Sequence, residues 1–498
     1  MTHNFNIAAK NYKQELKIRL ENDEKIGISP EISNDKSRYE LSERISAIHC
    51  GGIGIVNEVI HKSGLVDLIN DNIHLLKVHK PYHESDHILN IAYNIICGGN
   101  CLEDIELLRN NIPYLNALGA ERIPDPTTAG DFLRRFDENS IFNLIDIVNQ
   151  VNQNIWNKKI PKKKIDAILD IDSTIHETYG ECKEKMDISY KGKWGFHPLV
   201  ITEANTGNHL YAINRSGNRS SNFNAGIWID RSIEVVKKHF RHTYLRGDTA
   251  FSLTNKFDDW DTRNISFVFG YDNHKNLILK ADSLPDYKWK RLKRYKKASD
   301  KPRKKKKRVK QEIVESRGFK DYHLKKEYIS EFSYRPVNCG QDYRVVVVKK
   351  VLDVKMGQEL LFEECRYFFY ITNIYHMTPA EVVKFINGRA NHENKIEQLK
   401  NGVSALKMPA SEFLANQAYI IIASLAWNIK SWIGLLCPDK EKGKTIIKME
   451  FKRFQNSLIN IPCQILNSGR YTVFRLLNYN SWVELIYRMS NQLKFLQI

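Results

Sequence analysis

The stretch DAILDIDSTIHETYG, residues 166–180, sets three aspartates at even-numbered positions among apolar, β-branched residues. In a β-strand, side chains two positions apart project from the same face, about 7 Å apart along the strand. Asp166, Asp170 and Asp172 would therefore share one face and repel one another unless a cation lies between them. One interpretation is a sheet edge that points at solvent, and the other is a cation-binding site.

The composition of the chain favours a large globular protein. With 498 residues it can form a large core or two to three domains. Its eight cysteines include no C-x-x-C pair, and no secretory leader is visible, so we expect reduced thiols in a cytosolic protein. The uncharged stretch 413–429 contains Asn416, Gln417 and Asn428. These polar residues favour a buried core helix, and we expect no membrane partner.

Positive charge is concentrated in one segment. Residues 288–310 contain fifteen Lys or Arg and one acid, which gives +14 of the formal net charge of +18. Such a block attracts polyanions, and Trp289 within it could stack on bases. The alternative is a solvated loop that has no partner. The densest part of the block consists of Lys304, Lys305, Lys306 and Lys307.

The hydrophobic pattern changes along the chain from a helical to a strand period. Helical spacing precedes residue 158, and Thr127 or Thr128 is the expected N-cap of one short helix. From about residue 160 the pattern predicts strands, a hairpin that turns at 205–208, and one long helix over 378–399. The predicted regions are a polar segment 1–40, a helical DNA-binding or dimerisation region 41–158, an α/β core 159–274, a β-rich insertion 275–365, the rest of the core 366–435 and a helical and basic region 436–498.

Two further carboxylates are placed where they could join Asp172. Asp248 ends the strand HTYLRGDTAF, and strand ends are where an α/β sheet presents catalytic side chains. On the helix around 378–399, Arg389, Glu393, Glu397 and Lys400 share one face, which is also the pattern of an exposed salt-bridged stripe. Carboxylates from two strand ends and a helix are suitable ligands for two Mg²⁺ or Mn²⁺ ions. Enzymes use such pairs of ions to cleave or transfer phosphodiesters.

Several ordered stretches resemble a known family. They are LDIDST, HPLVITEANTG, LRGDTAF, FVFGYDNHKN, GRANHENKIEQLKNG and FLANQAYIIIASLAWNI, within about 45–430. Together they resemble bacterial insertion-sequence transposases of the DDE type, transposase DDE domain group 1, of the insertion-sequence family 1380 type. The resemblance implies an RNase H-like core, a mixed sheet flanked by helices, with a β-rich insertion between the second Asp and the Glu.

The resemblance also implies the site and the activity. Asp172, Asp248 and Glu393 would be the catalytic, metal-binding triad for two Mg²⁺ or Mn²⁺ ions. Arg389 and Lys400 match the family's signature and would hold DNA phosphates, while Ile386 occupies its tyrosine position. The strand leaves the choice between Asp170 and Asp172 open, although Asp172 lies nearer its end. Asp170 and Glu397 are candidates for supporting positions around the ligands.

The implied function is cleavage at the ends of a mobile element and transfer of the 3′-hydroxyl into target DNA. The implied partners are the terminal inverted repeats, target DNA and a second copy of the chain in a synaptic homodimer. The implied location is the bacterial cytoplasm, in association with the nucleoid. Two alternatives stay open, an inactive DNA-binding derivative and a metal-dependent nuclease that performs no strand transfer.

Overall fold

The computed structural model describes residues 2–21, 37–39, 45–161, 165–178, 180–293, 309–357, 359–469, 471–477 and 480–496, with the backbone alone at 2–5, 20 and 390–393. The chain forms two compact units. The helical unit contains Met1–Lys162, Thr174–Arg219 and Asn394–Ile498. The sheet unit contains Lys163–Ser173 and Ser220–Glu393. Both α-helices and a large mixed sheet are present, which confirms the predicted mixed α/β class.

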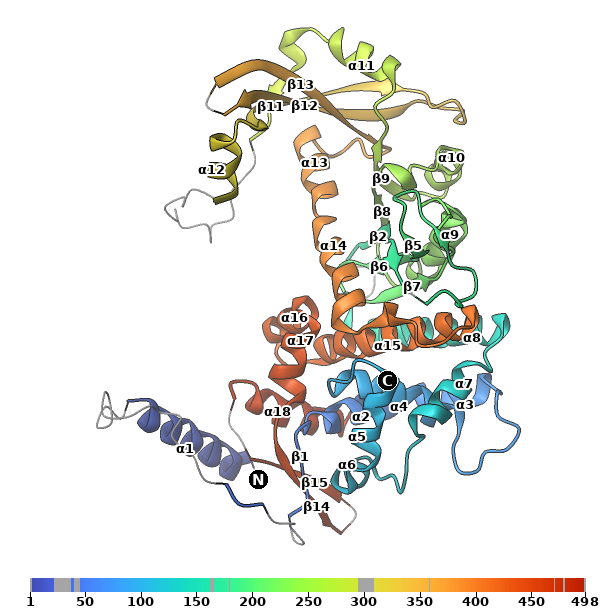
Figure 1. Ribbon diagram of the computed structural model, residues 1–498, viewed down its shortest axis with the longest axis vertical. Helices are drawn as coiled ribbons and strands as arrows, with labels where there is room; N and C mark the ends of the chain where they lie inside the picture. The colour runs from blue at the N-terminus through green and yellow to red at the C-terminus, as the bar shows by residue number, and fades with distance from the viewer. Residues whose placement is uncertain are drawn as a thin grey trace. The chain divides into compact units, whose positions relative to one another are not determined.

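The sheet unit is built on strands that stand in the order β10-β11-β12-β13-β9-β8-β2. β2, β8 and β9 run parallel, and the remaining neighbours are antiparallel. The predicted β-rich insertion forms the long strands β11 to β13 (Figure 1). The bounds are β2 (Ala167–Ser173), β8 (Thr243–Gly247), β9 (Ser266–Tyr271), β10 (Lys290–Arg291), β11 (Lys320–Tyr334), β12 (Tyr343–Met356) and β13 (Glu359–Thr372).

Helix α13 covers part of this sheet. Thr378 caps it through a reciprocal pair of hydrogen bonds with Glu381, and Pro379 occupies its first turn. Its apolar face of Val382, Val383 and Ile386 is buried against β9, β11 and β12, including Val268. The helices of the unit are α9 (Ala225–Val236), α10 (Thr254–Thr262), α11 (Lys275–Asp282), α12 (Val309–Ser316), α13 (Pro379–Asn387) and the first part of α14 (Ala390–Glu397).

The prediction of one long helix over 378–399 is wrong. The helix stops at Asn387, a turn contains Gly388 and Arg389, and α14 begins at Ala390. A methyl group at Gly388 would lie 2.5 Å from Nη1 of Arg246 and 3.0 Å from the Phe385 carbonyl oxygen, so a larger residue here requires the Arg246 guanidinium or the turn to shift. The interruption therefore has a packing cause that hydrophobic periodicity does not report.

The helical unit surrounds the buried helix α15 (Phe413–Leu436), which contacts α8 (Glu138–Lys159) and α4 (Glu84–Ile96). By length and composition α15 could cross a membrane, but 94% of its most apolar window is buried inside the protein. Its polar residues bond to backbone carbonyls, such as Gln417 to Ala212 and Asn428 to His209, at 2.9 Å in both cases. The prediction of a core helix is confirmed.

The other helices of this unit are mostly short. Asp125, rather than Thr127 or Thr128, caps α7, because its Oδ1 accepts the Thr128 backbone N–H at 2.9 Å. The bounds are α1 (Thr2–Glu21), α2 (Ile53–Lys62), α3 (Leu65–Asn72), α5 (Ile105–Arg109), α6 (Ile112–Leu118), α7 (Pro126–Leu133), α16 (Lys440–Lys448), α17 (Phe451–Phe454) and α18 (Val483–Leu493).

Strands also occur in the helical unit. β6 (Leu199–Glu203) and β7 (His209–Ile213) form the predicted hairpin. Two small sheets, in the orders β3-β5-β4 and β1-β14-β15, were not predicted. The C-terminal region is therefore partly β rather than only helical and basic. The remaining bounds are β1 (Ala47–Ile48), β3 (His176–Glu177), β4 (Asp187–Ile188), β5 (Trp194–Phe196), β14 (Cys463–Ser468) and β15 (Tyr471–Leu476).

Candidate active site

The ends of two neighbouring parallel strands bring two of the predicted carboxylates to one place. The last registered pair of β2 and β8 is Ile171 with Gly247. Asp172 is the next residue of β2 and Asp248 is the first residue after β8, so they occupy the next register position of strands about 4.8 Å apart. This juxtaposition follows from the strand pairing, which the sequence pattern did not specify.

Each of the three aspartates around β2 bonds to an arginine. Asp166 accepts two hydrogen bonds from Arg241, at 2.8 and 2.7 Å. Asp170 accepts two from Arg246, at 2.5 and 2.9 Å. Asp172 Oδ2 accepts one from Arg389 Nη1 at 2.9 Å. The repulsion between the aspartates is therefore offset by arginine at all three positions.

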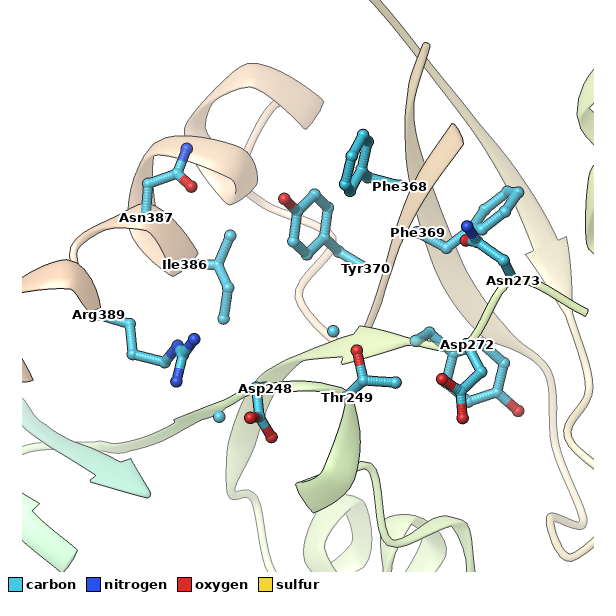
Figure 2. A pocket seen from close by; sticks show the side chains of 13 residues that line it. Asp248, Thr249, Asp272, Asn273, Phe368, Phe369, Tyr370, Ile386, Asn387 and Arg389 are labelled. Carbon is cyan, nitrogen blue, oxygen red and sulfur yellow. The ribbon is translucent and has the colours of Figure 1, made fainter. Parts of the chain in front are cut away.

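Asp248 lies at the margin of a cavity of about 440 Å³ within the sheet unit (Figure 2). Its Oδ1 accepts the Ala250 backbone N–H at 3.0 Å and so caps the short 3₁₀ turn that follows β8. Gly270 also lines the cavity, and a methyl group there would lie 2.8 Å from Oγ1 of Thr249. The absence of a side chain at Gly270 lets the turn that carries Asp248 approach β9.

Arg389 lies on the helical wall of the cavity and bonds one of the two aspartates. It lines the cavity together with Asp248, while its guanidinium bonds Asp172. Figure 2 shows Arg389, Ile386 and Asn387 on one side of the cavity and Asp248 on another. Ile386 occupies the signature's tyrosine position and is buried, but the cavity contains a tyrosine from another element, Tyr370 of β13.

Glu393 lies one turn after Arg389 in α14, and its side chain is outside the described part of the chain. Among the described residues, no group of three His, Cys, Asp or Glu side chains is placed to hold a metal ion. Asp172 and Asp248 offer only oxygen donors, and such donors fit Mg²⁺ or Mn²⁺. The pair supplies two of the three ligands predicted from the sequence, and Glu393 as the third stays a prediction.

A comparison with protein families matches residues 45–498 to transposase DDE domain group 1. The chain belongs to this family. The family expected from the sequence motifs is thus confirmed, and with it an assignment to the DDE transposases, which generally use divalent metal ions. A search of curated proteins finds no match.

Solved structures give a remote match to a piggyBac transposase, in a cryo-EM structure of a synaptic complex with hairpin DNA. The identity is 13%, and the alignment covers 92% of this chain and 88% of that chain at a TM-score of 0.33. A similarity at this score carries no argument about the fold or the activity of the transposase described here.

The two remaining residues of the predicted helix face, Glu397 and Lys400, lie in the helical unit of the transposase. Lys400 Nζ donates to the Ile175 carbonyl at 3.2 Å. Burial lowers the pKa of Lys400; the nearby Glu397 opposes this shift, and repulsion from two neighbouring lysines adds to it. Glu397 is exposed and accepts a hydrogen bond from Asn401. The proposed phosphate contact of Lys400 stays a prediction.

Trp289 lies beside a second cavity of the sheet unit, with a volume of about 700 Å³. Its ring centroid is 6.2 Å from that of Tyr367, and Lys349 Nζ lies 5.6 Å from the centre of the Trp289 ring. Tyr367 and Lys349 line this cavity, which shares Asn273 with the first cavity. Residues 294–308 of the lysine-rich segment, including Lys304, Lys305, Lys306 and Lys307, lie outside the described residues.

One acidic residue that lines the first cavity was missed by the sequence analysis. Asp272 follows β9 directly, is exposed and lines the same cavity as Asp248. Gly247 pairs with Phe269 in the parallel β8–β9 ladder, so Asp272 lies two residues beyond the position level with Asp248. The signal was present in FVFGYD, an apolar strand that ends in an aspartate, as in LRGD.

Proposed function

We propose that the protein cuts DNA at the ends of its own mobile element and joins the freed 3′-hydroxyl to target DNA. The observation that carries this proposal is the level position of Asp172 and Asp248 at the ends of β2 and β8, together with Arg389. A sheet fixes such carboxylates well enough to position metal ions. The proposal includes an RNase H-like core and an element of the insertion-sequence family 1380 type, and the parallel order of β2, β8 and β9 supports that core.

Asp172, Asp248 and Glu393 would hold two Mg²⁺ or Mn²⁺ ions. When bound, such ions activate a water or 3′-hydroxyl and stabilise the leaving oxygen of an in-line phosphodiester displacement. Arg389 places a guanidinium beside Asp172, where it can orient a phosphate of the strand being cut. Asp170 supports this arrangement from within the sheet, and its role is developed below.

We infer that DNA is held by cations outside this site. The lysine-rich segment would bind phosphates without sequence preference, and Trp289 with Lys349 would contact bases or backbone beside the cavity. Lys400 would contribute a further phosphate contact. Cleavage of two element ends together calls for a homodimer, to which residues 41–158 would contribute, acting on nucleoid DNA in the bacterial cytoplasm.

The activity is tested with the DNA that flanks the gene. A plasmid carries both flanking segments around a marker, and the full-length protein is added with Mg²⁺ and a target plasmid. We expect excision at terminal inverted repeats and joining of marker DNA to the target, and both should stop when EDTA removes the metal. Cleavage that is not followed by joining would favour the nuclease, and binding that is followed by neither would favour the inactive derivative.

The DNA contact of the lysine-rich segment is tested separately. Changing Lys304, Lys305, Lys306 and Lys307 to Gln should weaken binding to flanking and unrelated DNA by similar factors. The slope of log K against log salt should flatten by up to about three to four units, since each duplex phosphate contact contributes about 0.9. A selective loss for flanking DNA, with an unchanged salt slope, would contradict a sequence-independent contact.

A further inference from the structure

The buried pair of Asp170 and Arg246 lies directly below the proposed metal site. The two residues are register partners on β2 and β8, and each precedes a candidate metal ligand by two positions. Because side chains two apart on a strand share a face, the ion pair forms one layer and Asp172 with Asp248 the next. The side chains of Asp170 and Arg246 are only 1% and 7% exposed.

Arg246 also holds the end of helix α13. Its Nη1 donates to the Phe385 carbonyl at 2.9 Å, and its guanidinium lies 5.1 Å from the centre of the Phe385 ring. Carbonyls in the last turn of a helix lack intrahelical partners, and the helix dipole favours a cation there. One guanidinium thus joins β2, β8 and the C-terminal turn of α13.

After Phe385 the chain passes Arg246 and continues through Gly388 and Arg389 into α14. Gly388 follows Asn387 and passes so close to Arg246 that a methyl group there would lie 2.5 Å from Nη1, so a side chain would require the guanidinium or the turn to shift. The next residue is Arg389, whose guanidinium reaches Asp172, and α14 with Glu393 begins immediately afterwards. Arg246 thus contacts the residues that immediately precede the helix of the third predicted ligand.

We propose that Asp170 and Arg246 are positioning residues that set the start of α14, and with it Arg389 and Glu393, against Asp172 and Asp248. This inference rests on the proposed function. A well-packed apolar pair could fill the same buried volume at no cost in stability. An apolar pair has no guanidinium that could donate to Asp170 and to the Phe385 carbonyl of α13 at the same time. The proposed positioning requires both contacts.

The test compares three forms of the full-length protein with the wild type. The first is the double variant Asp170→Leu with Arg246→Met, which removes both buried charges together. The second is Gly388→Ala, which keeps the ion pair and displaces the α13–α14 turn. The matched control is Asp166→Leu with Arg241→Met, which removes an Asp–Arg pair from the opposite end of the same two strands.

Thermal unfolding, binding to flanking DNA, Mn²⁺ binding in the presence of that DNA and the cleavage rate at saturating DNA are measured. For the first two variants we expect DNA affinity to be retained and cleavage to fall roughly 100-fold, the effect of a misplacement of about 1 Å. The Mn²⁺ concentration for half-saturation should rise at least about tenfold, and the control should match the wild type. A purely structural role would change unfolding but leave the metal dependence of the folded protein unaltered.

Wild-type cleavage and Mn²⁺ affinity in a folded double variant would overturn the inference. If the double variant does not fold, Gly388→Ala decides, because wild-type Mn²⁺ binding and cleavage in that variant would likewise overturn it. A wild-type protein that cuts no flanking DNA would overturn the proposed function instead. The change in Mn²⁺ binding between the wild type and the variants would then still decide the inference.

Discussion

The two ends of the β2–β8 pair carry the same kind of ion pair in different settings. At the amino end, Asp166 bonds Arg241, whose side chain is 62% exposed. At the carboxyl end, Asp172 bonds Arg389, and their side chains are only 14% and 20% exposed. Arg241 lies two residues before β8, whereas Arg389 comes from a turn between two helices, 217 residues from its partner. Only the Asp172–Arg389 pair depends on where a helix lies, because Arg389 is in the turn between α13 and α14.

The three aspartates in and beside β2 therefore have different roles, although the sequence places them on one face. Asp166 is half-buried and bonds an exposed arginine, Asp170 is part of the buried framework, and Asp172 bonds an arginine that lines the cavity. Charge alone does not separate these roles. They follow from the partner of each side chain and from how far the pair is removed from water.

The largest expected effect is at the carboxyl end. Replacing Asp172, Asp248 or Glu393 singly with Ala should reduce cleavage of flanking DNA by at least about 10³-fold while binding to that DNA is retained, because the carboxylates hold metal and the affinity comes from Lys and Arg. Cleavage assays in Mg²⁺, with Asp166→Ala as the control, measure the difference. Wild-type cleavage by Glu393→Ala would remove Glu393 from the site.

The second-largest effect is expected on the free energy of unfolding, for the buried Asp170–Arg246 pair. Asp170→Ala leaves the buried Arg246 guanidinium without its carboxylate, and breaking a buried pair in this way costs roughly 3–5 kcal/mol in the free energy of unfolding. Urea unfolding of the single variant and of Asp170→Leu with Arg246→Met provides the measurement. We expect the double variant to recover most of the loss. Equal destabilisation of both would show that the volume of these side chains, and not their charge, is what matters.

A smaller effect is expected for Arg389. Its removal frees Asp172 from a competing cation but takes away the proposed phosphate contact. Arg389→Ala should therefore lower cleavage roughly 10- to 100-fold at saturating Mn²⁺ and also lower the Mn²⁺ concentration for half-saturation. Arg389→Lys should recover part of the rate. An unchanged salt dependence of DNA binding would contradict the phosphate contact.

The sequence predicted the individual elements around the site well. Period-two segments predicted β2, β8, β9 and the hairpin of β6 and β7, and the resemblance predicted the family. Asn416, Gln417 and Asn428 correctly indicated a core helix, and each of the three donates a hydrogen bond to a buried backbone carbonyl. These features are local, and they depend on side-chain pattern and turn chemistry within a short window.

The sequence could not predict the partners across the fold. Arg241, Arg246 and Arg389 lie 75, 76 and 217 residues from the aspartates they bond. The break at Gly388 depends on a side chain from β8, so the helical pattern continued through it in the prediction. Asp272 belongs to the cavity only because β9 pairs with β8 in one register. The catalytic roles of Asp172, Asp248 and Glu393 stay predictions.

The smallest effect is expected at the amino end of the two strands. Arg241→Met removes two hydrogen bonds to Asp166, but the arginine is largely exposed, so water and salt screen the pair and its loss should not measurably change the midpoint of thermal unfolding. Asp166 raises the pKa of Arg241, yet arginine stays protonated throughout the working pH range, so no pH dependence should follow. Cleavage and Mn²⁺ dependence should equal those of the wild type, because neither residue of this pair lines the cavity. A loss of cleavage comparable to that of the Arg246 variants would mean that the whole β2–β8 ladder, and not its carboxyl end, positions the site.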